Sequence, residues 1–448
     1  MEKYLKIIEK YEQIVLDGFN YIWSNPETGY REWKTHKYMK DVFEALGYTL
    51  NEMGNIPGFW TDVDTGKEGP TLAIFAEMDG LLVPTHPESD KETGAVHSCG
   101  HCMQTAALLG LAAALKEPEV LEGLSGRIRL IAVPAEEGVE LEFRKSLVDS
   151  GVIKSKSGKI EFIHRGVLDG VDLSFMMHSS TARPVDCAYL NSGSNGLMSK
   201  LVTFHGVSAH AALAKDGVNA LYAATTALSA INALRETFID EDHIRVHPII
   251  SKGGSSVNAI PDEVKLESYV RGANMDAIVA ANRKVNRAIA ASAASIGAKV
   301  TITDMQGSWP RWNDRVMVET FREAMGAVVE KVIINLDDWN AGCSDMGDMA
   351  SLMPTIHGYV GGAIGTEHGS DYLFTDPKTT CMNAAKIELL ATILLLQNGA
   401  EKAKEAVAKY TPYFKSKEEY IEYQSKIART YEAVEYKENG DVVLKIGE

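Results

Sequence analysis

Apolar residues recur along the first part of the chain at two different spacings. Residues 1–24 and 32–46 carry them at helical intervals, and residues 105–115 are rich in Ala and Leu, so each segment is predicted to be a helix. Residues 71–76 form a short apolar run that ends in a turn, which is typical of a buried strand. Residues 126–133, which are mostly apolar but include Arg127 and Arg129, are also predicted to be a strand followed by a loop. This alternation predicts an α/β fold with a mostly parallel sheet between layers of helices.

The pattern changes after the Gly- and Ser-rich segment 192–196. Strands and helices are then predicted in the order strand-helix-strand-strand-helix-strand, at 197–204, 219–235, 247–251, 263–271, 275–297 and 299–305. This is the order of a ferredoxin-like α+β domain. We therefore expect an inserted domain at 195–307, which separates the two parts of the first domain, 1–194 and 308–400. The charged, Tyr-rich residues 401–448 are expected to form a helical extension.

Charge and composition narrow the possible partners and the compartment. Acidic residues outnumber basic ones by 61 to 45, a net charge of −16, which argues against nucleic-acid or anionic-membrane partners. No uninterrupted apolar stretch reaches the ~20 residues that span a bilayer, and the first residues lack the apolar core of a secretory signal. Five cysteines, an odd and small number, fit a reducing compartment, so we expect a cytoplasmic protein.

The densest group of metal-binding residue types is the segment His-Ser-Cys-Gly-His-Cys at 97–102. Cys99 and Cys102 could form a dithiol redox pair at a helix N-terminus, or a buried turn with inert thiols. Alternatively, Cys99 and His101 could bind a metal ion from one turn, with remote ligands completing the site. The residues that follow along the chain favour this last interpretation.

Carboxylates and histidines follow further predicted strands. Glu136 and Glu137 come after the run 126–133, where one carboxylate could bind a metal and the other could act as general base. His178 ends a predicted strand and His368 lies in a Gly-rich segment, although a single histidine is more often structural than a ligand. Asp79 could orient a metal-binding histidine, or merely cap a turn.

The predicted inserted domain contributes three weaker candidates. His210 lies in a loop between a predicted strand and helix, and Asn258 lies in a turn that it could simply cap. Arg271, at the end of a predicted strand, could pair with a carboxylate of the substrate or form a surface ion pair.

Taken together, these segments resemble the metal-dependent aminoacylase/dipeptidase-type amidohydrolases, most closely the N-acyl-amino-acid and aminobenzoyl-glutamate hydrolases. The resemblance rests on the His-x-Cys-Gly-His segment at 97–101, the Glu pair at 136–137, and the later His178 and His368. It extends to Gly-x-x-Ala-His-Ala at 206–211, Gly-Gly-x-x-x-Asn-x-Ile-Pro at 253–261, and Ser-Asp-Met-Gly-Asp at 344–348.

The resemblance implies a metallo-aminopeptidase-like α/β domain, an inserted lid and dimerisation domain, and a homodimer. It implies a site with two divalent ions, Zn or Mn, which cleaves a small amide or dipeptide substrate and has as ligands Cys99, His101, Glu137, His178 and His368. Glu136 would be the general base, and His210 would bind the substrate or the oxyanion. Asn258 and Arg271 would bind the substrate carboxylate.

The chain departs from the family pattern at four positions near the proposed ligands. Phe75 replaces a frequent Arg, Glu77 an Asp, Cys102 an Asp or Asn, and Gln104 a His. These changes leave the ligands in place but affect the expected metal and substrate preference. Two other functions are retained as alternatives. One is a thiol–disulfide oxidoreductase that uses Cys99 and Cys102, and the other, which Cys102 and Gln104 keep open, is a non-catalytic homologue that binds metal or ligand.

Overall fold

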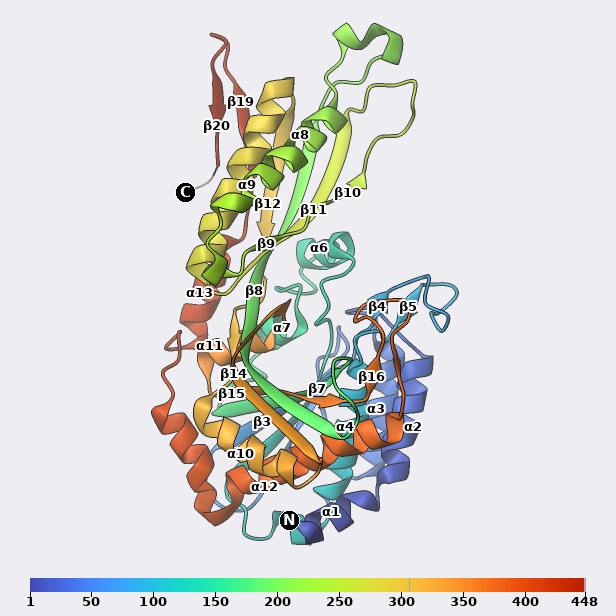
Figure 1. The fold of residues 1–448 in the computed structure, drawn as a ribbon, viewed down its shortest axis with the longest axis vertical. Helices are drawn as coiled ribbons and strands as arrows, with labels where there is room; N and C mark the ends of the chain where they lie inside the picture. The colour runs from blue at the N-terminus through green and yellow to red at the C-terminus, as the bar shows by residue number, and fades with distance from the viewer. Residues whose placement is uncertain (306, 447–448) are drawn as a thin grey trace. The chain divides into compact units, whose positions relative to one another are not determined.

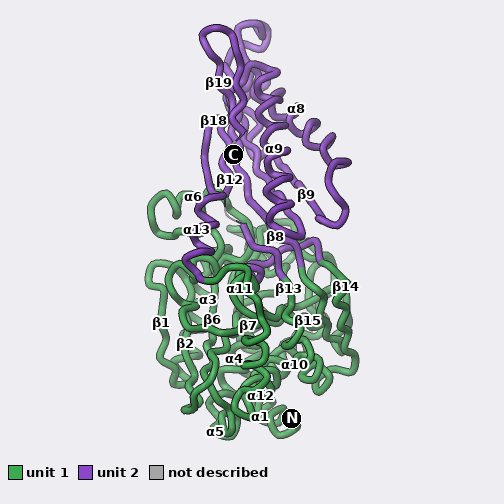
Figure 2. Tube along the Cα trace, turned by 90° about the vertical axis from the view of Figure 1, so that its left-hand side faces the viewer, with its two compact units in different colours: residues 1–193, 312–339, 348–415 green, residues 194–311, 340–347, 416–448 purple. Residues whose placement is uncertain are grey.

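The computed structural model describes residues 1–305 and 307–446, in two compact units (Figures 1 and 2). Unit 1 consists of residues 1–193, 312–339 and 348–415. Unit 2 consists of residues 194–311, 340–347 and 416–448. The chain thus leaves unit 1 after residue 193 and later returns to it, and the C-terminal residues belong to unit 2 rather than to unit 1.

Unit 1 is built on a mostly parallel sheet (Figure 1). At its centre, β6 (Arg127–Val133), β3 (Thr71–Glu77), β7 (Leu173–Ser180) and β15 (Thr355–Gly361) lie in this order, and each neighbouring pair is parallel. Antiparallel strands flank them: β1 (Asn51–Glu52) and β2 (Phe59–Asp64) beside β6, and the first part of β8 (Cys187–His205) beside β15. Every residue of β3 is buried, as is typical of a central parallel strand. The predicted mixed α/β fold is confirmed.

Helices α4 (His101–Ala114) and α12 (Pro377–Lys409) pack on each other and on β7. α4 is buried along its whole length, which explains why its sequence is apolar on all sides. α12 leaves helical geometry at Gln397–Ala400. It is long and apolar enough to cross a membrane, but 89% of its apolar window is buried inside the protein, which is the environment of a core helix.

Other helices of unit 1 are α1 (Glu2–Glu9), α2 (Glu12–Ser24), α3 (Trp33–Ala45), α5 (Pro118–Leu121), α6 (Leu141–Asp149), α7 (Gly158–His164) and α10 (Arg315–Gly326). The single helix predicted for residues 1–24 is wrong in one respect, since it is broken between Glu9 and Glu12. The amphipathic period continues across that break, so apolar spacing alone could not reveal it. Two short antiparallel pairs, β4 (Leu81–Leu82) with β5 (Ala95–Val96) and β16 (Ala363–Ile364) with β17 (Leu373–Phe374), complete the loops of this unit.

The core of unit 1 contains one acidic side chain with an incomplete set of partners. Glu388 of α12 is 1% exposed, and its Oε2 has no hydrogen-bond partner among the described residues. Burial raises the pKa of Glu388 well above its usual value, although a hydrogen bond with the Met177 backbone opposes the shift. The folded protein therefore holds the Glu388 proton at a pH where the unfolded chain has released it.

This difference makes the stability of the protein depend on pH. The contribution of Glu388 is fully present below its unfolded pKa and is lost as pH rises toward the higher folded pKa. We expect Glu388→Gln to flatten the decline in the free energy of unfolding as pH rises above the unfolded pKa of a glutamate, about 4.3. Urea unfolding at several pH values measures this slope, and parallel curves for the two proteins would contradict the prediction.

Unit 2 has an antiparallel sheet that carries two helices. The second part of β8 pairs with β11 (Glu263–Gly272) on one side and with β12 (Lys299–Met305) on the other. β9 (Arg245–Val246) and β10 (Ile249–Lys252) pair with β11. The helices α8 (Ala220–Ala233) and α9 (Met275–Ile296) contact each other and β11. Asn274 caps α9 by accepting a hydrogen bond from the Ala277 amide, as its position in the sequence suggests.

The prediction of a helical extension at 401–448 is correct only in part. The first residues complete α12, and α13 (Lys417–Ile427) follows. The chain then forms β18 (Arg429–Glu432), β19 (Val434–Tyr436) and β20 (Val442–Leu444). β18 pairs with β12, so a strand that would otherwise end the sheet gains a neighbour. The many charged residues concealed this short β-rich segment.

Candidate metal centre

The chemically interesting residues of unit 1 gather at the carboxyl ends of its parallel strands. Glu77 ends β3, Glu136 and Glu137 follow β6, and His178 lies near the end of β7. His368 lies on the loop between β16 and β17, after β15. Parallel strands present their carboxyl ends at one edge of a sheet, which is where α/β enzymes place their sites.

Cys99 and His101 reach this edge from the start of α4. Gly100 lies between them with a φ of +92°, which favours glycine, and a Cβ at this position would collide with the Ser179 and Tyr372 side chains. The helix begins directly at His101. The Cys-Gly-His sequence therefore allows two ligand side chains to leave one tight turn without a clash.

Asp79 orients two of the predicted ligands. The Nδ1 atom of His101 lies 2.9 Å from the Asp79 backbone oxygen and 3.2 Å from its Oδ1. The other carboxylate oxygen, Oδ2, accepts a hydrogen bond from the Glu137 amide at 2.9 Å. The Nε2 atom of His101 is thereby left available on the opposite side of the ring. Contacts of this kind fix the orientation of metal-binding side chains.

Two groups of possible ligands share one sulfur atom. Ligand atoms of Cys99, His101 and His178 all lie within 4.8 Å of one another, and the same is true of Cys99, Glu137 and His368. Cys99 Sγ is 3.5 Å from His178 Nε2, and His368 Nε2 is 3.4 Å from Glu137 Oε1. Two ligand atoms on one zinc-like cation are about 3.0–3.6 Å apart, given the usual bond lengths.

Two buried atoms that lack a hydrogen bond also indicate that these residues fit divalent cations. His101 Nε2 and Glu137 Oε1 are buried, yet they have no hydrogen-bond partner in the part of the chain that the structure describes. Buried polar atoms are normally satisfied, so such a pair requires an explanation. A sulfur, imidazole nitrogens and a carboxylate are the donors that zinc and similar ions bind. The donor set and its spacing thus suit two neighbouring cations.

His368 is held next to the Cys99 segment by its backbone. Its amide donates a hydrogen bond to the Ser98 carbonyl at 3.0 Å, and its φ is +62°, in the left-handed region. A non-glycine residue in this region is uncommon and costs backbone energy. The contact places a residue from the last quarter of the chain beside one from the first.

Charges at the site shift several pKa values. Burial raises the pKa of Glu137, but the facing His368 and His101 outweigh this effect and lower it to about 2. Glu137 in turn raises the pKa of His368. Burial and Glu137 raise the pKa of the Cys99 thiol well above its usual value. A bound cation reverses this last effect, because it stabilises the thiolate.

Glu136 is half-buried and lies beside the ligands. One of its carboxylate oxygens lies within 4.8 Å of ligand atoms of both Glu77 and His101. The residue before it, Ala135, has a φ of +57°, and its amide donates to Glu32 Oε1 at 2.8 Å. The turn that carries Glu136 and Glu137 is thus fixed from both sides, by Glu32 and by Asp79.

The three candidates from the inserted segment belong to unit 2. His210 and Asn258 lie on adjacent loops, where the Ala211 amide donates to the Asn258 carbonyl at 2.9 Å. Both side chains are exposed. Arg271 is on β11, with its guanidinium 5.5 Å from the centre of the Tyr269 ring. Their roles remain predictions.

The redox interpretation of Cys99 and Cys102 is not supported. Cys102 is fully buried in the hydrophobic core of unit 1, and burial raises the pKa of its thiol well above the usual value. A catalytic redox thiol needs exposure and a low pKa. The two cysteines are only three positions apart but lie in different environments. Cys99 is among the candidate ligands, and Cys102 is in the core.

Sequence reasoning missed part of the surroundings of His101. Lys159, on α7, is fully buried and forms an ion pair with Glu77, while Gln104 Nε2 donates to Glu77 Oε2 at 2.8 Å. Glu77 and Gln104 were recognised only as departures from a pattern. Nothing near Lys159 in the sequence indicates that it is buried at the site.

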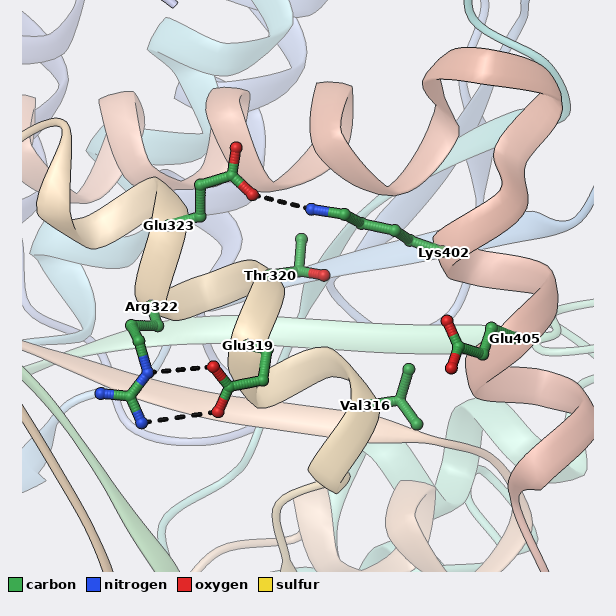
Figure 3. Close-up of a pocket in the computed structure, with 7 residues that line it drawn as sticks. All are labelled: Val316, Glu319, Thr320, Arg322, Glu323, Lys402 and Glu405. Atoms are coloured by element: carbon green, nitrogen blue, oxygen red, sulfur yellow. Dashed lines mark hydrogen bonds and ion pairs between the residues drawn. The ribbon is translucent and has the colours of Figure 1, made fainter.

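A surface pocket of about 500 Å³ lies elsewhere on unit 1, between α10 and α12 (Figure 3). Its charged groups pair with each other: Arg322 Nε is 3.1 Å from Glu319, and Lys402 Nζ is 2.8 Å from Glu323. None of the predicted site residues lines it, so the candidate site remains the one at the strand ends.

The fold, and the candidate metal ligands with a further carboxylate beside them, are the features expected of a metal-dependent hydrolase. Comparison with known families is more specific: residues 73–391 match the model of peptidase family M20/M25/M40, and the chain belongs to this family of amide-bond hydrolases.

Individual relatives share about a third of their residues or fewer with this chain over the matched region. The chain is 28% identical to N-acetyl-L-cysteine deacetylase of Bacillus subtilis, over 67% of this chain and 69% of that protein. It is 34% identical to one of the subunits of the p-aminobenzoyl-glutamate hydrolase of Escherichia coli, over 49% of each chain. A Bacillus subtilis protein described as a dinuclear metal-binding peptidase has a similar fold, with a TM-score of 0.63 at 20% identity over 87% of this chain and 99% of that one.

Proposed function

We propose that this protein hydrolyses the amide bond of an N-acyl or N-aminoacyl amino acid with the help of two divalent ions. The observation that carries the proposal is the position of Cys99, which belongs to two ligand groups at once, with Glu136 adjacent. A single structural metal would need neither a shared ligand nor a further carboxylate beside it. Zn and Mn are the proposed ions, since the donor set combines a soft sulfur with carboxylate and imidazole.

Each nearby side chain has a distinct part in the proposed reaction. Cys99, His101 and His178 would hold one ion, and Cys99, Glu137 and His368 the other. Bound divalent ions supply polarisation of the amide carbonyl and a lower pKa for a water molecule. Glu136 accepts the proton of the attacking water and delivers it to the leaving amine. Asp79 keeps His101 and Glu137 in the orientation that binding requires.

The substrate class follows from the relatives. The names of the two relatives given above concern an N-acyl amino acid and an aminobenzoyl amino acid, and a third, from Mus musculus, is a dipeptidase. Each such substrate joins an acyl or aminoacyl group to an amino acid. We propose that Asn258 and Arg271 bind the carboxylate of that amino acid, and that His210 binds the substrate or the oxyanion of the transition state.

Unit 2 would serve as a lid and as the dimer contact. It carries several exposed apolar side chains, among them Tyr222 at 62%, Ile249 at 61% and Val257 at 101% exposed, which a dimer contact could cover. These support a homodimer. The five cysteines, all of which the structure describes, form no disulfide, which supports the proposal that the protein works in a reducing compartment such as the cytoplasm.

The test begins with metal removal. We expect the purified protein to contain close to two divalent ions per chain and to lose hydrolytic activity when a chelator removes them. Activity should return with Zn²⁺ or Mn²⁺. The activity is measured as the release of free amine from a panel of N-acyl amino acids, aminobenzoyl-glutamate and dipeptides. Chelator-resistant hydrolysis, or no hydrolysis of any member by the reconstituted protein, would refute the proposed function.

A further inference from the structure

Glu77 is not among the proposed ligands, yet its carboxylate contacts the ring of His101, which is one of them. It is the last residue of β3 and is 1% exposed. Its Oε2 is 3.1 Å from His101 Nε2, the nitrogen directed away from Asp79. Two atoms that bind one cation at 2.0–2.2 Å are about 3.0–3.4 Å apart, depending on the bond angle. The separation between Glu77 and His101 is therefore that of two ligands of one ion.

The positions of the two atoms also suit a shared cation. His101 Nδ1 contacts the Asp79 backbone oxygen, so Nε2 is the ring nitrogen that faces Glu77. This Nε2 is buried and has no hydrogen-bond partner among the described residues. A cation that contacts both His101 Nε2 and Glu77 Oε2 would give the buried nitrogen a partner.

The carboxylate of Glu77 is prepared for such a contact. Lys159 pairs with Oε1, and both side chains are almost completely buried. Gln104 Nε2 donates to Oε2 at 2.8 Å, and its Oε1 accepts the Glu77 amide at 3.1 Å. An oxygen that accepts one hydrogen bond keeps a second lone pair. The positive charge of Lys159 balances the negative charge of Glu77. The carboxylate can therefore lie at the site without adding net charge to it.

We propose that Glu77 is an additional ligand of the cation that His101 binds, and that Lys159 is the counter-charge that keeps this carboxylate in place. The inference rests on the two-ion site of the proposed function. It assigns one further oxygen ligand to this position and none to the position of Glu137 and His368. Carboxylate oxygen suits manganese better than sulfur does, so Glu77 should raise the affinity for Mn²⁺ relative to Zn²⁺.

The experiment uses Co²⁺ as a spectroscopic probe in the full chain. The visible absorption of Co²⁺ is weak in five- or six-coordinate sites and strong in tetrahedral ones. We expect Glu77→Gln to intensify the visible bands of the Co²⁺-loaded protein, because one site loses a ligand. Titrations should show Mn²⁺ affinity falling roughly 10- to 100-fold and Zn²⁺ affinity falling less. Glu161→Gln is the matched control, since Glu161 is an equally buried glutamate that bonds backbone amides of Lys154 and Ser155. Its spectrum should equal that of the wild type.

The outcomes separate a ligand from a residue that only positions His101. A positioning role would lower both affinities alike and leave the Co²⁺ bands unchanged, and this result would overturn the proposal. If Glu77→Gln does not fold, the double variant Glu77→Leu/Lys159→Met removes both buried charges and carries the same spectral test. The proposed function fails separately, when the metal-loaded wild type cleaves no amide, whatever the spectra show.

Discussion

Glu136→Gln is expected to retain the fold and both metal ions and to lose about 10²- to 10⁴-fold in turnover. The amide is nearly the same size as the carboxylate but cannot accept the proton of the attacking water. Glu136 lies outside the two ligand groups that share Cys99, although its carboxylate is within 4.8 Å of ligand atoms of Glu77 and His101. If it acts as the general base and binds no ion, its loss should not release one. Turnover on the best substrate of the panel, with metal content measured on the same sample, tests this.

The neighbouring residue gives the matched control. Glu137→Gln makes the same chemical change one position later, but Glu137 lies against His368 within a ligand group. This variant should lose metal as well as activity, and added metal should restore part of the activity. Near-normal turnover of Glu136→Gln would show that another group accepts the proton. Metal loss in that variant would show that Glu136 is a ligand.

Cys99→Ala should abolish the binding of both ions, because its sulfur is the one atom common to the two groups. His368→Ala, by contrast, should remove one ion and leave the other. A protein that binds an ion only in its folded state gains stability from it, by about 2.7 kcal/mol when the free ion is at 100 times its Kd. Added Zn²⁺ should therefore raise the melting temperature of the wild type but not that of Cys99→Ala.

Cys102→Ala serves as the control for the loss of a thiol. Cys102 is three residues away and lies in the core, so its substitution should reduce stability slightly and leave the metal content at the wild-type level. Full metal binding by Cys99→Ala would remove the basis of the shared site. Metal loss in Cys102→Ala would mean that the core thiol takes part in binding.

The sequence predicted those features that depend on short segments. An apolar run indicated β3, because a strand that is buried on both faces has no polar side to interrupt it. The grouping of Cys99 with Glu137 and His368 was inferred from a resemblance, and the structure brings their ligand atoms within 4.8 Å of one another. The parallel sheet explains why this is possible, since strands far apart in sequence end at one edge.

Features that depend on tertiary pairing escaped prediction. The ion pair between Glu77 and Lys159 joins the end of a strand to a helix that follows much later, and neither residue has a distinctive neighbour. β18 is only four residues long, and its strand character comes from pairing with β12 rather than from its own apolar pattern. The break between α1 and α2 has no glycine or proline to mark it.

The hydrogen bond from the His368 amide to the Ser98 carbonyl has a consequence for biosynthesis. The ribosome must synthesise about four fifths of the polypeptide before His368 exists, so the proposed second ion position can form only late in synthesis or after it. Its assembly therefore follows that of the segment around Ser98, which is made much earlier.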